Sequence, residues 1–147
     1  MIKNVMLIDD NKIDLFINQR IIEKYNSEIN TRVFTSAISA ISFLKILELN
    51  VGIKSLTVPD VILVDINMPE MDGFTFFKEF KQLRLLEKYA IEVYMVSSSI
   101  CPSDIFKAQK ENNCSGYIMK PLTVDKFKSV VHKSVSINQE QNFKEII

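Results

Sequence analysis

The feature that most constrains this chain is a regular alternation between short apolar runs and longer stretches with helical spacing. The short runs are mostly rich in β-branched or aromatic residues and are bounded by polar positions, as strands are. They read NVMLID at 4–9, TRVF at 31–34, VILVDI at 61–66, EVYMVS at 92–97 and GYIM at 116–119. Most of them lack strict polar alternation, which is typical of strands covered on both faces of a parallel sheet, whereas TRVF would suit an edge.

The stretches between these runs have apolar residues at helical spacing. Helices are predicted around residues 13–21, 37–47, 74–80, 102–113 and 124–131, the fourth of them weakly patterned but opened by Pro102 and Ser103. We expect Gly52 to end the second helix. Five strand–helix units in strict alternation predict a parallel sheet with helices on both faces.

Composition and charge narrow the function classes. The chain has 147 residues, of which 47% are apolar and 24% charged, an ordinary balance for one globular domain. Its formal net charge is zero, so it has no basic excess for binding nucleic acid or an anionic membrane surface. No apolar run is long enough to span a membrane and no secretory signal is visible, which predicts a cytoplasmic protein. Cys101 and Cys114 lie too far apart for a CxxC motif, and we expect reduced thiols.

The carboxyl ends of the predicted strands carry the chemically active residues. Asp9 and Asp10 end the first run, Asp65 lies at the end of the third, Ser97 ends the fourth and Lys120 follows the fifth. Ligands of an open parallel sheet bind outside the carboxyl ends of its strands, so these side chains are expected to share one rim. Each residue alone could be a helix cap or a solvated side chain, but their conjunction favours a site.

Three carboxylates converge at this rim if the first and third strands are neighbours. Two such charges about 5 Å apart repel by roughly 3 kcal/mol at an effective dielectric of about 20, so a cation is needed among them. The set offers only oxygen ligands, which favours Mg²⁺ together with a phosphoryl oxygen. Asp65 is then a carboxylate nucleophile that forms an acyl phosphate, while Lys120 and Ser97 satisfy the phosphoryl oxygens.

These residues resemble the receiver domain of two-component response regulators, in its CheY-like, single-domain form. The resemblance covers residues 3–135 and rests on the DD pair, D-x-N-M-P-x-M-D-G from Asp65, the hydroxyl after the fourth strand and the KP dipeptide at 120–121. It implies a flavodoxin-like (βα)5 fold. The expected sheet is doubly wound, parallel and five-stranded, with strand order 2-1-3-4-5 and helices on both faces.

The resemblance implies a phosphoryl and metal site. Asp65 would be the phospho-acceptor. Asp9, Asp10, Asp65 and the backbone carbonyl of Asn67 would hold Mg²⁺, for which Mn²⁺ could substitute.

The resemblance also implies a switch. Ser97 would bind a phosphoryl oxygen, Lys120 would pair with Asp65 and then with its phosphoryl group, and Tyr117 would be the aromatic switch residue. The Lys120–Pro121 peptide bond, trans by default, would be cis.

The implied function is signalling rather than enzymatic turnover, with catalysis limited to the protein's own phosphorylation and dephosphorylation. His132 lies away from the strand ends, so the phosphoryl group would come from a partner histidine kinase, hybrid kinase or phosphotransfer protein. Phosphorylation would switch a face, formed by the fourth helix, fifth strand and fifth helix, that a downstream target protein reads. A phosphorelay shuttle and a phosphate-independent adaptor are the alternatives.

Two rival classes are disfavoured by the same residues. A phosphatase of the haloacid-dehalogenase class would carry D-x-D on one strand, whereas the acids here are adjacent. An FMN carrier would cradle a phosphate in its first loop, where DDNKID presents two carboxylates.

The domain boundaries follow from the pattern. Residues 1–135 are expected to form the receiver domain. Residues 136–147, SINQEQNFKEII, are too short for an output domain and are expected to be a free tail or an extension of the last helix. Two segments are longer than a minimal receiver needs, LELNVGIKSLTVPD at 47–60 and KEFKQLRLLEKY at 78–89. They are interpreted as tolerated insertions, with partner surfaces as the alternative.

Overall fold

The computed structural model describes residues 1–49, 57–132 and 143–147. The expected helix end at Gly52 lies outside these residues, as do residues 133–135 of the expected domain. Along the chain, the elements are β1 (Asn4–Ile8), α1 (Lys12–Tyr25), β2 (Asn30–Phe34), α2 (Ala37–Leu49), β3 (Val61–Asp65), α3 (Gly73–Phe80), α4 (Leu85–Lys88), β4 (Glu92–Ser97), α5 (Pro102–Lys110), β5 (Cys114–Met119), α6 (Val124–Val131) and β6 (Lys144–Ile146).

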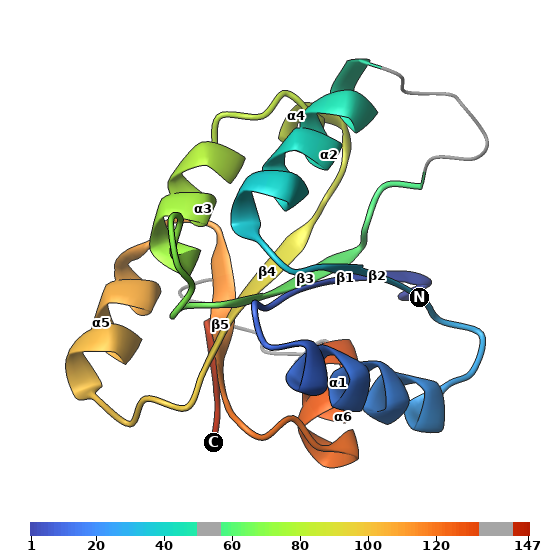
Figure 1. The fold of residues 1–147 in the computed structure, drawn as a ribbon, viewed down its shortest axis with the longest axis vertical. Coiled ribbons are helices and arrows are strands. Elements are labelled where there is room, and N and C mark those ends of the chain that lie inside the picture. The colour runs from blue at the N-terminus through green and yellow to red at the C-terminus, as the bar shows by residue number, and fades with distance from the viewer. Residues whose placement is uncertain (50–56, 133–142) are drawn as a thin grey trace, which may run out of the picture.

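The strands form one parallel sheet with helices on both faces (Figure 1). The sheet order is β2-β1-β3-β4-β5-β6, which confirms the predicted order 2-1-3-4-5 and the edge position of β2. Helices α1 and α6 cover one face, and α2, α3 and α5 cover the other. The expectation of a five-stranded sheet is wrong by one strand, because β6 extends the sheet beyond β5.

The central strands explain why their sequences read as continuous apolar runs. All five residues of β3 are buried, and successive side chains enter opposite layers of the core. Ile62 and Val64 pack in the layer under α2, α3 and α5, whereas Val61 and Leu63 pack in the layer under α1 and α6. A strand that is covered on both faces has no position for a polar residue until it reaches its end. The first polar side chain of β3 is therefore Asp65, at the rim.

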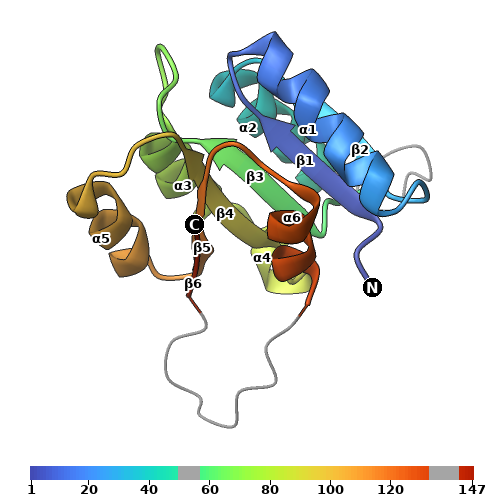
Figure 2. The ribbon, with the colours of Figure 1, turned by 90° about the horizontal axis from the view of Figure 1, so that it is seen from below.

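The end of the chain differs from the expected free tail or helical extension. Residues 144–146 form β6, which pairs in parallel with β5 in the register Gly116↔Lys144 (Figure 2). Gly116 permits this approach, because a Cβ atom there would overlap the carbonyl oxygen of Lys144. The Lys144 ammonium donates to the carbonyls of Ser129 and His132 at the end of α6, and Ile146 is buried.

The lengthened segment between β3 and β4 contains a second short helix. Helix α3 ends at Phe80, and α4 covers only Leu85–Lys88. Leu83 and Leu85 are buried against the α2 and α3 layer, so the insertion adds to the core. Within the described part of the chain, no helix has the length and apolar character needed to cross a membrane.

Candidate functional site

The carboxyl ends of β1, β3, β4 and β5 bring the predicted residues to one rim. Ile8 pairs with Val64 in the ladder, so Asp9 follows β1 beside Asp65, the last residue of β3. Ser97 ends β4 opposite Met119, and Lys120 comes directly after it. The parallel register therefore places the predicted acids, hydroxyl and lysine in adjacent positions, as the strand-end rule predicts.

Three carboxylates meet at this rim. Asp9, Asp10 and Asp65 each offer an oxygen, and these oxygens lie within 4.8 Å of one another. Asp9 is 4% exposed and Asp65 is 7% exposed, while Asp10 faces solvent. All the ligand atoms are oxygens, and one side of the cluster is open. This donor set fits a hard divalent cation that keeps part of its water shell.

Lys120 supplies the positive charge of the site. Its Nζ lies 2.8 Å from Asp9 Oδ2, 2.9 Å from Asp65 Oδ2 and 3.1 Å from Asp14 Oδ2. Burial alone would lower the pKa of Lys120, but the hydrogen bonds with Asp9 and Asp65 outweigh it and hold that pKa above its usual value. Burial raises the pKa of Asp65, and the hydrogen bond from Lys120 opposes this rise. The ammonium thus compensates acids that would otherwise repel in a desolvated site.

Asp14 is a residue of this site that the sequence reasoning missed. It lies in the first turn of α1, and Asn11 caps that helix by accepting from the Asp14 N–H at 3.2 Å. An acid in the first turn of a helix is commonly explained by the helix dipole, so the sequence pattern gives no sign of its contact with Lys120.

Backbone groups hold the two buried acids in place. Asp9 Oδ1 accepts from the N–H of Asn11 at 2.9 Å, and Asp65 Oδ1 accepts from the N–H of Asn67 at 3.0 Å. Gly73 allows the start of α3 to close against the same loop, since a Cβ there would lie 2.7 Å from the Asp65 carbonyl oxygen. Each of the two acids therefore presents one oxygen to a backbone donor and the other to Lys120.

Ser97 and Tyr117 both hydrogen-bond to the backbone of Ser99. Ser97 is fully buried, and its Oγ accepts from the Ser99 N–H at 3.0 Å. The ring of Tyr117 is also buried, and its hydroxyl donates to the Ser99 carbonyl at 2.8 Å. A movement of Ser97 would therefore affect Ser99, whose carbonyl anchors the Tyr117 hydroxyl.

The Lys120–Pro121 peptide bond is cis, the isomer that the resemblance implies.

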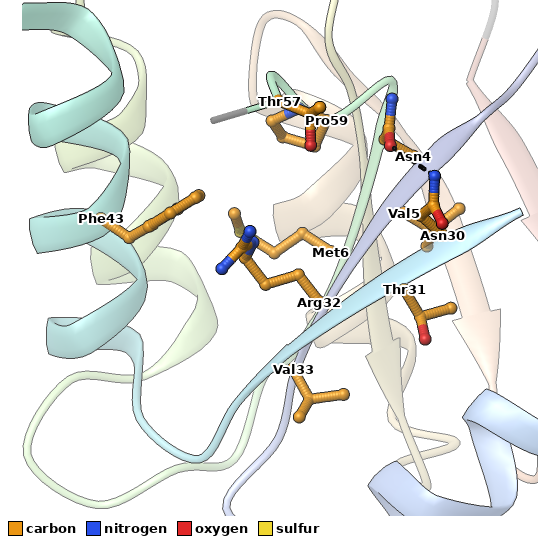
Figure 3. Close-up of a pocket in the computed structure, with 10 residues that line it drawn as sticks. All are labelled: Asn4, Val5, Met6, Asn30, Thr31, Arg32, Val33, Phe43, Thr57 and Pro59. Carbon is orange, nitrogen blue, oxygen red and sulfur yellow. Dashed lines mark hydrogen bonds between the residues drawn. The ribbon is translucent and has the colours of Figure 1, made fainter. Parts of the chain in front are cut away.

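Two other groups lie away from this rim. His132 is exposed and caps the far end of α6. A pocket of about 360 Å³ opens at the opposite end of the sheet, where Arg32 lies 4.5 Å from the Phe43 ring centroid (Figure 3). Among the described residues that line it, Arg32 carries a charge and none has a carboxylate. The pocket is thus separate from the acidic cluster in both place and charge.

Comparison with known proteins gives a consistent family. The family model for the response regulator receiver domain matches residues 5–132. A crystal structure of a two-component response regulator from Cytophaga hutchinsonii is 32% identical, with a TM-score of 0.76 over 88% of this chain and 93% of that one. A response regulator receiver protein from Dyadobacter fermentans is 27% identical, with a TM-score of 0.72 over 88% of this chain and 94% of that one.

Curated relatives include both small regulators and large kinases. The polar-differentiation response regulator DivK of Brucella ovis is 26% identical over 86% of this chain and 91% of its own length. The sensor histidine kinase CheAY of Helicobacter pylori is 32% identical over 58% of this chain, which covers 10% of that kinase. The chain likewise covers 14% of the probable histidine kinase 6 of Oryza sativa. With its fold, its rim residues and a family match that spans most of its length, this chain belongs to the response regulator receiver domain family of two-component signalling systems.

Proposed function

We propose that this protein is a phospho-accepting receiver, which takes a phosphoryl group onto Asp65. The observation that carries the proposal is the position of Lys120, whose ammonium lies 2.9 Å from Asp65 Oδ2 within a cluster of acids. A nucleophilic carboxylate beside a fixed cation matches the needs of phosphoryl transfer, where positioning and charge compensation dominate catalysis.

The transfer is a displacement at phosphorus. A carboxylate oxygen of Asp65 attacks the phosphorus of a phosphohistidine, the P–N bond breaks, and the imidazole of the donor leaves with the bond electrons. Lys120 stabilises the negative charge on the phosphoryl oxygens, and the Ser97 hydroxyl donates a hydrogen bond to one of them.

The metal site is part of the same proposal. Asp9, Asp10 and Asp65, with the carbonyl of Asn67, would hold Mg²⁺ or, as a substitute, Mn²⁺. When bound, this ion supplies charge neutralisation at the transferred oxygens. The oxygen-only donor set and the mutual repulsion of the acids support this assignment.

The output is a change of surface. When Ser97 turns to the phosphoryl group, it gives up its hydrogen bond from Ser99, and the carbonyl that anchors the Tyr117 hydroxyl is free to shift. Tyr117 lies in β5, between α5 and the start of α6 in the chain. A downstream target protein would read the face formed by α5, β5 and α6, of which β6 is a neighbour.

The phosphoryl donor is a histidine kinase, a hybrid kinase or a phosphotransfer protein. Helix α1 begins beside the acids and exposes apolar side chains, with Ile13 70% and Phe16 59% exposed. Such a surface next to the nucleophile suits a donor that must bring its histidine to Asp65. The sensor kinases among the relatives agree with this class of partner.

Labelling with a small acyl phosphate tests the proposal. The protein is incubated with Mg²⁺ and acetyl phosphate and then weighed intact by mass spectrometry, with Asp65→Asn as the matched variant. Wild type should gain one phosphoryl group that mild base removes, and the variant should gain none. If wild type stays unmodified, or if Asp65→Asn is labelled equally, the protein is not a receiver that uses Asp65. A phosphate-independent adaptor gives the first of these results.

A further inference from the structure

We propose that Asp14 is the positioning residue of Lys120: it keeps the ammonium over Asp65 while a cation and a phosphoryl group occupy the other acids. This inference rests on the proposed function, because it concerns the lysine that serves the transferred phosphoryl group. Its basis is the third contact of the ammonium, at 3.1 Å to Asp14 Oδ2. Asp14 was not among the site residues predicted from the sequence.

The ammonium of Lys120 has no spare donor in this arrangement. It has three N–H groups, and the structure gives it three carboxylate acceptors: Asp9, Asp65 and Asp14. Two of the acceptors, Asp9 and Asp65, are nearly buried, whereas the Asp14 side chain is 35% exposed. Asp14 therefore contacts Lys120 from the solvent side of the site.

The acids divide into two sets. The cluster whose oxygens lie within 4.8 Å of one another consists of Asp9, Asp10 and Asp65, and Asp14 lies outside it. A divalent cation in that cluster competes with Lys120 for the oxygens of Asp9 and Asp65, and like charges repel the ammonium. Asp14 would remain available to accept from Lys120 when an ion occupies Asp9 and Asp65. The division gives the cation one set of carboxylates and the lysine a carboxylate of its own.

The backbone fixes Asp14 for this task. Asp9 Oδ1 accepts from the Asn11 N–H, and Asn11 Oδ1 accepts from the Asp14 N–H. Asp14 and Asp9 then both accept from Lys120, which closes a ring of hydrogen bonds. The first turn of α1 also favours a negative side chain, because the helix dipole is positive there. Two hydrogen bonds to backbone N–H groups thus tie Asp14 to Asp9 within one short loop.

The test compares Asp14→Asn with Asp14→Glu and with a matched control. At saturating Mg²⁺, we expect Asp14→Asn to slow the labelling of Asp65 by acetyl phosphate about tenfold, since an ammonium without its third anchor spends less time at the phosphoryl oxygens. Asp14→Glu should restore part of the rate. Asp125→Asn removes an exposed acid from the first turn of α6 and should leave the rate unchanged.

Two further measurements separate positioning from a general charge effect. In a Lys120→Met background, Asp14→Asn should cause no further loss of rate, because its effect passes through the lysine. The Mg²⁺ dissociation constant, measured by calorimetry on unphosphorylated protein, should rise much less for Asp14→Asn than for Asp10→Asn. Equal losses of Mg²⁺ affinity, an unchanged labelling rate, or a full tenfold loss in the Lys120→Met background would each overturn the proposal.

A readout without phosphorylation distinguishes this inference from the proposed function. Nitrogen-15 NMR of the lysine ammonium groups should show slow proton exchange for Lys120 in the wild type and faster exchange in Asp14→Asn. If wild type cannot be labelled but this difference is present, the proposed function fails and the anchoring contact stands. If the difference is missing, the positioning role fails whatever the labelling shows.

Discussion

The two ends of β3 each carry an aspartate, and the fold uses the two carboxylates differently. At the amino end, Asp60 Oδ2 accepts from the backbone N–H groups of Lys3 at 2.8 Å and Asn4 at 2.9 Å, which ties the start of the chain to the sheet. At the carboxyl end, Asp65 meets other acids and the ammonium of Lys120. The carboxylate of Asp60 is satisfied by two backbone N–H groups, while that of Asp65 belongs to a cluster in which negative charges outnumber the positive one.

The difference shows what separates a structural acid from a candidate functional one. Asp60 directly precedes β3 and Asp65 is its last residue, so both lie at an end of the same buried strand and this position does not distinguish them. What differs is convergence, because other carboxylates meet Asp65 whereas backbone donors meet Asp60. Variants of the two acids and of their partners should therefore differ in metal affinity, labelling and stability.

The largest effect is expected at Lys120. Lys120→Met should reduce the labelling rate of Asp65 by about a hundredfold, since it removes the fixed positive charge that faces the phosphoryl oxygens. Lys81→Met is the control. Lys81 forms an ion pair with Glu111 at 2.7 Å, and this pair does not include any of the rim residues. Rates come from intact-mass time courses with acetyl phosphate. A loss of less than threefold in Lys120→Met would remove the lysine from the chemistry.

A second effect separates the two ends by metal affinity. Asp10→Asn should weaken Mg²⁺ binding by at least about tenfold, because a divalent ion loses one charged oxygen ligand. It should also raise the melting temperature in metal-free buffer, where the acids repel one another. Asp60→Asn should leave Mg²⁺ affinity unchanged and should not raise the melting temperature, because its carboxylate accepts from two backbone N–H groups and meets no other acid. Calorimetric titration and thermal melts with and without Mg²⁺ measure both, and equal effects of the two variants would erase the contrast.

A third effect concerns the stability of the fold and not the labelling of Asp65. Asp60→Ala should lower the free energy of unfolding by about 1–3 kcal/mol, because two backbone N–H groups lose a charged acceptor. Its labelling rate should stay within twofold of wild type. Denaturant unfolding gives the first quantity and mass spectrometry the second. A large loss of labelling in folded Asp60→Ala would show that the amino end contributes to the site.

The smallest effect is expected in the pocket at the amino end. Arg32→Ala removes the guanidinium that lies over the Phe43 ring, and an exposed contact of this kind is worth about 0.5–1 kcal/mol. Mg²⁺ affinity and labelling should not change, since the residues described in the pocket lining include no carboxylate. The same unfolding and labelling assays apply. A shift in Mg²⁺ affinity would mean that the two ends of the sheet are coupled.

Much of the rim could be predicted because it follows from topology. Continuous apolar runs identify strands buried on both faces, and parallel strands bring their carboxyl ends to one side. Asp9, Asp65, Ser97 and Lys120 lie within one or two residues of those ends, so their convergence needed no knowledge of side-chain conformation. The edge position of β2 followed from the polarity of its sequence, whereas the order of the strands was implied by the resemblance to receiver domains.

The missed features depend on contacts that no local pattern encodes. Asp14 joins the site through the side chain of Lys120, which is 106 residues away in the chain. Strand β6 has only three residues, too few to show an alternation, and the spacing of Phe143 and Ile146 also fits a helix. Its place is set by Gly116, whose lack of a side chain admits the Lys144 carbonyl.

The backbone bonds to Asp9 and Asp65 also determine how costly ion binding is. Because Asn11 and Asn67 each hold one carboxylate oxygen, the torsions of both acids are already restricted before anything binds. The entropy of ordering these groups is spent during folding rather than on arrival of an ion. Lys120 contacts the other oxygen of each of these acids, so it is the side chain that would have to adjust when an ion binds.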